Sequence, residues 1–239
     1  MIKVGCCGFP IKKERYYSEF KVVEVQKTFY DPRNIETFKK WRVNAPDDFE
    51  FTIKAWQGVT HDIKSPTWKR YKGELIGKKE RYGLLHFTEE VMWAWERTLD
   101  AANALNSNII VVQLPPKLSW DENNEDIKKT IDYLLESKKI IVIEPRNKTW
   151  FREEVYDYFR KNNIVFCTDP FKNGLIDTHR DVMYLRLHGI GGYKYKYNEE
   201  ELKALYTWVE PYLDQRKIYV MFNNVYMYEN AKQFLDMLG

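Results

Sequence analysis

The sequence has few cysteines and no long apolar run. Only three of the 239 residues are cysteine, and two of them, Cys6 and Cys7, are adjacent, so we expect reduced thiols and no disulfide framework. No apolar stretch approaches the roughly 20 residues that span a bilayer. The first residues show neither the apolar core nor the cleavage pattern of a signal peptide. We therefore expect a cytoplasmic protein with no membrane partner.

Net charge is also small. Lys and Arg number 38 against 35 Asp and Glu, which leaves a net charge of +3. An excess this small does not by itself indicate a polyanion as partner. Hydrophobic residues, by contrast, make up 44% of the chain and are spread along its length, which excludes a disordered protein. A chain of this size buries enough surface to fold without disulfides.

Short apolar runs alternate with amphipathic stretches from end to end. The runs are rich in β-branched residues, as strands covered on both faces are, and they span residues 2–7, 21–26, 49–55, 109–114, 140–144, 164–168, 182–187 and 218–222. Apolar residues at helical spacing predict helices over residues 89–105, 126–135, 149–159, 199–213 and 230–238. Thr88 is in place to cap the first of these helices.

This alternation favours an α/β fold, a closed (β/α)8 TIM barrel, over an open doubly wound sheet. An open sheet usually has fewer strands, and the glycines after the first run, Gly5 and Gly8, do not have the G-x-G-x-x-G spacing. We predict a single domain over residues 1–239. Residues 56–88, after the third strand, form a long insertion, and loops of this length are typical of lids and binding loops.

Polar side chains lie where the predicted strands end, and TIM barrels carry their reactive groups at that end. In chain order these residues are Cys6, Cys7, Glu24, Gln26, Lys54, Gln113, Glu144, Arg146, Asp169, Arg186, His188, Asn223 and Asn224. Charges in an apolar run are costly unless they face a cavity or one another. The sequence therefore predicts a polar pocket at the carboxyl ends of the strands.

Several segments resemble the domain of unknown function 72 (DUF72) family, the YecE-like TIM-barrel proteins. They follow the order of the family along essentially the whole chain: VVEVQKTFY (22–30), FTIKAWQGVTH (51–61), QLPP (113–116), EPRNKTW (144–150), YLRLHG (184–189), the tyrosine-rich stretch to Tyr197, and MFNN (221–224). The resemblance implies a single TIM barrel but no particular reaction. Analogy with endonuclease-IV-like and sugar-isomerase-like barrels suggests DNA processing for relatives, on fold alone.

Glu24 and Glu144 are the best pair of carboxylates for proton transfer, one as acid and one as base. The alternative is that they form ion pairs, for instance Glu144 with Arg186 or Lys54. Their strands are the second and the fifth, too far apart around a barrel for a retaining glycosidase, whose carboxyls lie about 5–5.5 Å apart. His188 is the third catalytic candidate, although a lone histidine at a strand end more often belongs to the scaffold.

Lys54, Arg146 and Arg186 would place three cations around one barrel mouth. Guanidinium groups bind phosphate and carboxylate, so we expect a small anionic or phosphorylated ligand; the alternative is that each cation neutralises an acid of the protein itself. The glycines after His188 would let backbone N–H groups approach a phosphate. The other residues expected to bind substrate are Gln26, Tyr30, Gln113, Asp169 and Asn223.

No H-x-H or H-E-x-x-H spacing indicates a metal site, so we expect no cofactor, although a divalent metal held by Glu24, Glu144, Asp169 and His188 stays open. Cys7 has no identifiable histidine partner, and a buried thiol is the favoured interpretation. Aromatic rings alternate with lysines in KSPTWKRYKG (64–73) and GGYKYKY (191–197). Such stretches fit base stacking with phosphate contacts, and loop packing is the alternative.

Together these patterns predict a hydrolase-like enzyme that acts on a phosphorylated or otherwise anionic substrate at the C-terminal face of the barrel. Glu24 or Glu144 would transfer protons, and His188 would orient or assist. Two other hypotheses remain: a nucleic-acid-binding or nucleic-acid-processing protein of endonuclease-IV-like character, and a non-catalytic barrel that binds a metabolite.

Overall fold

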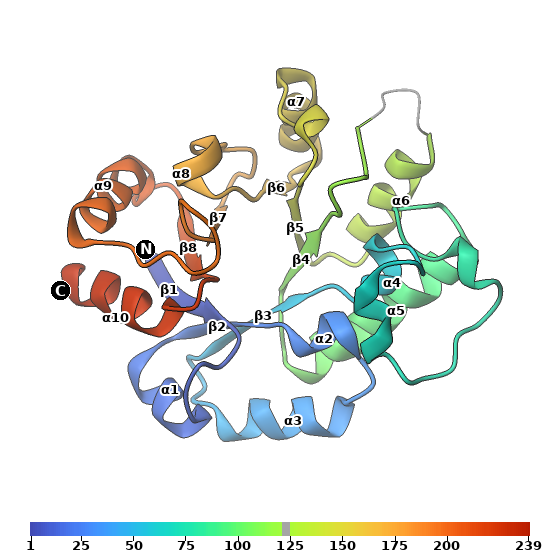
Figure 1. The fold of residues 1–239 in the computed structure, drawn as a ribbon, viewed down its shortest axis with the longest axis horizontal. Coiled ribbons are helices and arrows are strands. Elements are labelled where there is room, and N and C mark those ends of the chain that lie inside the picture. The colour runs from blue at the N-terminus through green and yellow to red at the C-terminus, as the bar shows by residue number, and fades with distance from the viewer. Residues whose placement is uncertain (121–124) are drawn as a thin grey trace. The chain divides into compact units, whose positions relative to one another are not determined.

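The computed structural model describes residues 1–120 and 125–239, in which eight strands alternate with helices (Figure 1). The strands are β1 (Ile2–Cys7), β2 (Val22–Val25), β3 (Glu50–Lys54), β4 (Ile109–Gln113), β5 (Ile140–Glu144), β6 (Val165–Phe166), β7 (Val182–Leu187) and β8 (Lys217–Phe222). The fold is α/β, of the (β/α)8 TIM-barrel class that the sequence predicts.

Helices follow most strands directly. They are α1 (Lys13–Glu19), α2 (Lys27–Tyr30), α3 (Ile35–Asn44), α4 (Gln57–Thr60), α5 (Glu89–Ala104), α6 (Glu125–Leu135), α7 (Glu153–Asn162), α8 (Pro170–Asn173), α9 (Glu199–Val209) and α10 (Met227–Met237). Short 3-10 turns add η1 (Pro66–Arg70), η2 (Lys79–Arg81), η3 (Lys148–Trp150) and η4 (Glu210–Tyr212). None of the helices in the described parts of the chain is long and apolar enough to cross a membrane. A cytoplasmic location stays a prediction.

The chain divides into two compact units. The first unit comprises residues 1–24, 45–50 and 156–239, and the second comprises residues 25–44 and 51–155. Each unit contains parallel strands that pair with one another. That residues 1–239 form a single domain stays a prediction.

The sheet of the first unit is strongly curled. Its strands pair in the order β2-β1-β8-β7, all parallel. Neighbouring strands lie about 4.8 Å apart, so β2 and β7 would be about 14 Å apart in a flat sheet. Glu24 on β2 nevertheless accepts hydrogen bonds of 2.9 Å from both Tyr184 and Arg186 on β7. Only a sheet that bends toward closure brings these side chains together.

The second unit is built on the parallel strands β3, β4 and β5, whose apolar residues are almost wholly buried. Thr88 caps α5, because its side chain accepts a hydrogen bond from the backbone N–H of Val91, as the sequence predicts. The short helix α4 packs against α5 at Gly58. A Cβ atom at Gly58 would lie 2.8 Å from the Cβ of Ala94, so this close approach requires glycine.

Residues 56–88 contain α4, η1 and η2 and have an aromatic core of their own. Trp56 lies at the centre, with ring centroids 5.7 Å from Trp68, 4.9 Å from Tyr71 and 6.2 Å from Tyr82. Trp56 and Tyr82 are fully buried, and Trp68 and Tyr71 nearly so. Edge-to-face aromatic packing of this kind stabilises the segment as part of the second unit. A lid-like role for it stays a prediction.

The helical periodicity did not predict α1, α2, α3, α4 or α8 in the described parts of the chain, and two of the predicted helices differ in extent from those found. In α3 only Phe38 is buried, so the helix lacks the wide apolar stripe on which the prediction depends. The predicted helix over residues 149–159 divides into η3 and α7, which begins at Glu153. The predicted helix over residues 199–213 ends at Val209 and gives way to η4, which contains Pro211.

Candidate functional site

Polar side chains collect at the carboxyl edge of the sheet in the second unit. Lys54 ends β3, Gln113 ends β4 and Glu144 ends β5. The register aligns these ends, since Lys54 pairs with Val111 and Gln113 pairs with Glu144. Together with Arg146, two residues beyond β5, they form what we call the strand-end cluster. Carboxyl ends of parallel strands are where α/β proteins bind their ligands.

Within the strand-end cluster, Glu144 forms an ion pair with Arg146. The guanidinium Nη2 lies 2.9 Å from Oε1 of Glu144. The glutamate side chain is only 4% exposed, whereas that of Arg146 is 31% exposed. The buried carboxylate therefore has a cation beside it, and that cation is reachable from solvent. The sequence left open an ion pair for Glu144, for instance with Arg186 or Lys54, and the structure pairs Glu144 with Arg146.

Lys54 is the most enclosed cation of the cluster, with 7% of its surface exposed. Its ammonium lies 3.7 Å from the centroid of the Phe29 ring, a cation–π contact that offsets part of the cost of burial. The backbone around it is fixed, because the hydroxyl of Thr28 contacts both the carbonyl of Lys54, at 2.6 Å, and that of Val25, at 2.9 Å. The backbone that carries the ammonium is thus fixed in place.

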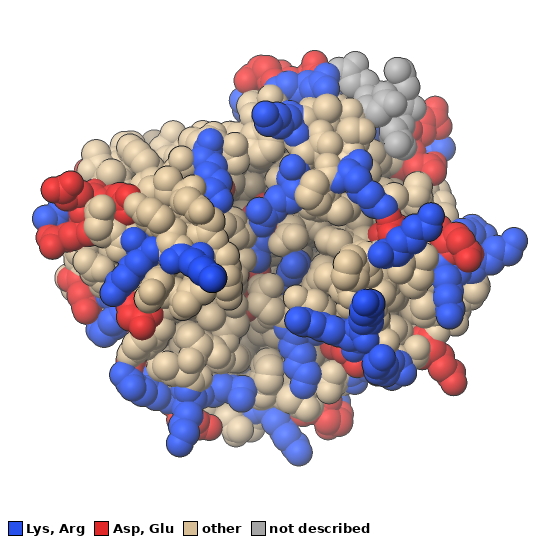
Figure 2. Space-filling view, in the orientation of Figure 1, with Lys and Arg blue, Asp and Glu red and all other residues tan. Residues whose placement is uncertain are grey.

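Tyr30 and Gln26 lie at the two ends of α2, and both are half-buried. Gln57 donates to the backbone carbonyl of Tyr30 at 3.4 Å. The guanidinium of Arg70, from η1, lies 4.2 Å from the centroid of the Tyr30 ring. Arg70 was not among the predicted site residues; its position inside the basic and aromatic stretch 64–73 was the available signal. Figure 2 shows Lys and Arg side chains gathered over α2 and α4.

His61 follows α4 and becomes part of this site. Its ring lies edge-on to Phe29, with the centroids 5.0 Å apart, and its Nδ1 is 2.8 Å from the hydroxyl of Thr60. Burial, followed by the positive charges of Lys54 and Lys117, lowers the pKa of His61 to about 4. The imidazole is therefore neutral at neutral pH. His61 was not among the predicted site residues, because it lies in the long insertion, distant along the chain from Phe29 and Lys117.

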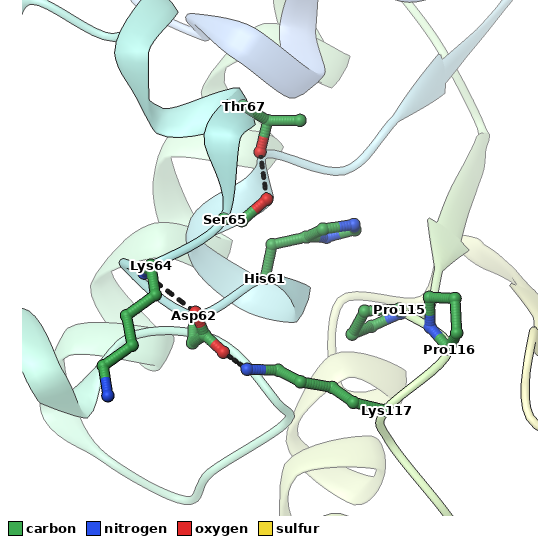
Figure 3. Close-up of a pocket in the computed structure, with 8 residues that line it drawn as sticks. All are labelled: His61, Asp62, Lys64, Ser65, Thr67, Pro115, Pro116 and Lys117. Atoms are coloured by element: carbon green, nitrogen blue, oxygen red, sulfur yellow. Dashed lines mark hydrogen bonds and ion pairs between the residues drawn. The ribbon is translucent and has the colours of Figure 1, made fainter.

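A pocket of about 480 Å³ opens beside His61, which we call the His61 pocket (Figure 3). It is lined by His61, Asp62, Lys64, Ser65, Thr67, Pro115, Pro116 and Lys117. Its prolines and Lys117 belong to the segment that follows β4, two to four residues beyond Gln113. A cavity of this size suits a small molecule, because such sites typically measure about 300–1,000 Å³.

Glu24 and Arg186 form the polar centre of the first unit. Both side chains are wholly buried, and Arg186 Nη2 donates to Glu24 Oε1 at 2.9 Å. Tyr184, two residues before Arg186 on the same face of β7, donates to Oε2 at 2.9 Å. Both carboxylate oxygens of Glu24 thus accept hydrogen bonds. These contacts are typical of a structural ion pair, and a catalytic role for Glu24 stays a prediction.

Asp169, His188 and Asn223 also meet within the first unit. Asp169 accepts hydrogen bonds from the backbone N–H of His188 at 2.9 Å and of Phe171 at 3.2 Å. The side-chain nitrogen of Asn223 lies 3.2 Å from Nδ1 of His188. Gly189, with φ of 85°, donates its N–H to the hydroxyl of Tyr197 at 2.8 Å. The turn after β7 is therefore fixed by hydrogen bonds on both sides of His188.

The predicted site residues thus fall into two groups. One group lies in the first unit: Glu24, Asp169, Arg186, His188 and Asn223. The other lies in the second unit: Gln26, Tyr30, Lys54, Gln113, Glu144 and Arg146. The roles assigned to all of them stay predictions.

The cysteines are free thiols, and all three are buried. Burial raises the pKa of Cys6 to about 12, so this thiol stays protonated and is a poor nucleophile. The neighbouring Cys7 is 5% exposed. Among residues 1–120 and 125–239, no group of three or more His, Cys, Asp or Glu side chains could hold a metal ion. That the protein needs no cofactor stays a prediction.

Most aromatic rings of the basic stretches are buried. Trp68 and Tyr71 of residues 64–73 belong to the aromatic core around Trp56, and Tyr197 is 1% exposed. Tyr195 is half-buried, and Tyr193 has 59% of its surface exposed. Rings that pack inside the protein cannot stack on bases. Loop packing, the second of the two interpretations left open, accounts for these buried rings, whereas nucleic-acid binding stays untested.

Comparison with known proteins identifies the family. A family model described as "Protein of unknown function DUF72" matches residues 12–239. The UPF0759 protein YunF of Bacillus subtilis (strain 168) is 25% identical over 267 residues, covering 95% of this chain and 86% of YunF.

Solved structures agree with this match. A DUF72 family protein from Thermotoga maritima MSB8 is 26% identical, with a TM-score of 0.70 over 100% of this chain and 99% of that one. A DUF72 family protein from Enterococcus faecalis V583 shares the fold, with 21% identity and a TM-score of 0.76 over 100% of this chain and 97% of that one. These matches confirm the resemblance seen in the sequence. The chain therefore belongs to the DUF72 protein family.

Proposed function

We propose that the protein is a hydrolase that binds a phosphorylated or otherwise anionic substrate at the strand-end cluster of the second unit. The observation that carries the proposal is the positive charge around His61. The pKa of this histidine is lowered to about 4, first by burial and then by the positive charges of Lys54 and Lys117. Lys117 is also paired with Asp62, so it is mainly the enclosed ammonium of Lys54 that favours an anion in this region.

Binding in this proposal depends on the cations at the strand ends. Lys54 supplies an enclosed ammonium on a fixed backbone, and Arg146 supplies a guanidinium that is reachable from solvent. Guanidinium and ammonium groups are the side chains that bind phosphate best. Gln113, in register with Glu144, adds an amide that can donate to a further oxygen of the anion.

Catalysis in this proposal depends on Glu144. Its carboxylate takes a proton from water as the water oxygen forms a bond to phosphorus and the bond from phosphorus to the leaving oxygen breaks. The same proton then passes from Glu144 to the leaving oxygen, so the ester is converted to an alcohol and phosphate with no other reactant. Lys54 and Arg146 stabilise the charge on the phosphoryl oxygens in the transition state. General-base catalysis of this kind contributes about 10²–10⁴-fold.

The test is hydrolysis of p-nitrophenyl phosphate by the purified protein. We expect turnover that falls by about 10²-fold or more in Glu144→Gln, with little change in KM, since the variant keeps the shape of the side chain and loses only its basicity. The matched control is Glu125→Gln, because Glu125 also forms an ion pair, with Lys129 at 2.9 Å, but its side chain is 78% exposed on α6. Equal activity in the two variants would reject Glu144 as the base.

A further inference from the structure

The His61 pocket contains polar groups that have no role in the proposed binding of an anion at the strand ends. We infer that this pocket binds the hydroxyl-bearing part of the substrate, so that the substrate is a phosphorylated sugar or polyol. The inference rests on the proposed function, in which the strand-end cluster holds the phosphate. Pro115 follows Gln113 by two residues, so the pocket and the cluster share the segment after β4.

One wall of the pocket is apolar but not aromatic. Pro115 and Pro116 form this wall. None of the eight residues that line the pocket is Phe, Tyr or Trp. A nucleobase or other aromatic group would find no Phe, Tyr or Trp ring on which to stack, and the imidazole of His61 is the one aromatic ring among the eight residues. A compact saturated ligand, in contrast, can pack its C–H groups against the proline rings.

A pair of hydroxyl groups faces the pocket on a second side. Ser65 Oγ and Thr67 Oγ1 lie 2.8 Å apart and share one hydrogen bond, and both residues are half-buried. A hydroxyl pair uses one of its two hydrogens internally and keeps the other, together with oxygen lone pairs, for a further partner. Such a pair can both donate to and accept from the hydroxyl groups of a ligand.

An ion pair lies on the side of His61 away from the hydroxyl pair (Figure 3). Asp62 and Lys117 form this pair, and Asp62 also accepts a hydrogen bond of 2.8 Å from the backbone N–H of Lys64. The side chain of Asp62 is 17% exposed and that of Lys117 is 54% exposed. A carboxylate accepts hydrogen bonds from hydroxyl groups, and an adjacent ammonium donates them. This arrangement suits a neutral polyhydroxyl group better than a second anion.

His61 lies between the hydroxyl pair and the ion pair, with its ring extending toward the side where Pro115 and Pro116 lie (Figure 3). Thr60 is fully buried, and its hydroxyl has Nδ1 of His61 as its hydrogen-bond partner among the described residues. A buried hydroxyl hydrogen without an acceptor is costly, so Thr60 donates to Nδ1 and the proton of the neutral ring is on Nε2. His61 therefore presents an N–H donor that suits a hydroxyl or carbonyl oxygen.

Calorimetry with inorganic phosphate, glycerol 3-phosphate, D-ribose 5-phosphate, D-fructose 6-phosphate and p-nitrophenyl phosphate tests the inference. We expect at least one sugar or polyol phosphate to bind about tenfold or more tightly than inorganic phosphate, and more tightly than the aryl ester. The double variant Ser65→Ala/Thr67→Val and the single variant His61→Phe should each lose about tenfold of this preference, the value of one or two hydrogen bonds. Affinity for inorganic phosphate should stay within about twofold in the hydroxyl double variant.

Two controls separate this result from general damage. Thr207→Val removes a comparable hydroxyl from α9, where Thr207 bonds the carbonyl of Lys203 at 3.1 Å, and should leave every affinity unchanged. Thermal unfolding shows whether each variant is folded. If inorganic phosphate binds as tightly as every sugar phosphate, or if the pocket variants leave the preference intact, the inference is overturned and the proposed anion site stands. If no phosphate compound binds, both are overturned.

Discussion

Arg186 donates a hydrogen bond of 2.9 Å to Glu24, and neither side chain has any exposed surface. The pair connects β7 to β2 across two intervening strands of the first unit. The hydroxyl of Tyr184 donates a hydrogen bond of 2.9 Å to the second oxygen of this carboxylate. A buried charge with its partners in place is tolerated, but one that loses its partner is not. The primary role of the pair is therefore to stabilise the folded first unit.

Replacing only Arg186 is expected to destabilise the protein strongly. Arg186→Met leaves the Glu24 carboxylate buried without its cation, so we expect the free energy of unfolding to fall by about 3–5 kcal/mol. Urea unfolding measures this difference. Arg160→Met is the control, because Arg160 pairs with Asp157 on an exposed surface and should cost under about 1 kcal/mol. The double variant Glu24→Leu/Arg186→Met should recover part of the loss; no recovery would contradict the ion-pair account.

The pKa of His61 predicts a dependence of stability on pH. The pKa is lowered from 6.5 to about 4 in the folded protein, so between these values the unfolded chain binds more protons. The neutral ring therefore makes its full contribution to stability above about pH 6.5. As the pH falls from 6.5 toward 4, the free energy of unfolding decreases by about 3 kcal/mol. His61→Gln should reduce this slope. Denaturant unfolding at several pH values measures it, and parallel pH profiles for the two proteins would refute it.

The aromatic core of residues 56–88 predicts that this segment is well ordered in the free protein. Trp68 contacts Trp56 and Tyr82 and donates its indole N–H to the carbonyl of His61 at 3.0 Å. Trp68→Ala should therefore lower the free energy of unfolding by about 3–5 kcal/mol. Trp208→Ala, at a site that is 40% exposed, is the control and should cost less. Hydrogen exchange should show protected amides in 56–88, and rapid exchange throughout would indicate a mobile lid.

Salt dependence distinguishes a small anion from nucleic acid. Residues 56–88 contain seven Lys and Arg against three Asp and Glu, and this net charge of +4 exceeds the +3 of the whole chain. Several phosphate contacts to DNA or RNA would make the affinity fall steeply with salt, by about 10³–10⁵-fold between 50 and 200 mM for six to ten contacts. We expect only weak binding of a single-stranded oligonucleotide, because most rings of the basic stretches are buried. Fluorescence anisotropy measures it, and tight, salt-sensitive binding would favour the nucleic-acid hypothesis.

Periodicity predicted the strands well, because buried parallel strands leave continuous β-branched runs. The predicted runs 2–7, 140–144 and 182–187 match β1, β5 and β7 residue for residue. By contrast, α3 was missed because it buries only Phe38, and an exposed helix leaves little periodic pattern in the sequence. The alternation of strands and helices and the family resemblance both predicted the barrel fold, which the comparisons then confirmed.

The pairing of the charged residues could not be predicted from the sequence. Whether Glu144 pairs with Arg146, and Glu24 with Arg186, depends on how the strand ends meet in space. His61 was not predicted as a site residue for the same reason, because its neighbours Phe29 and Lys117 are distant in the chain. Strand ends identify polar residues, whereas the partner of each one is set by register and loop packing.

Titration of the protein with inorganic phosphate, comparing wild type with Lys54→Met, tests the central claim most directly. Lys129→Met is the matched control, because it removes an exposed lysine of α6. We expect phosphate to bind the wild type and the control equally, and Lys54→Met to bind at least about tenfold more weakly, as expected for one charge-assisted contact. Equal affinity of all three folded proteins for phosphate, or no binding by the wild type, would contradict an anion site at the strand-end cluster.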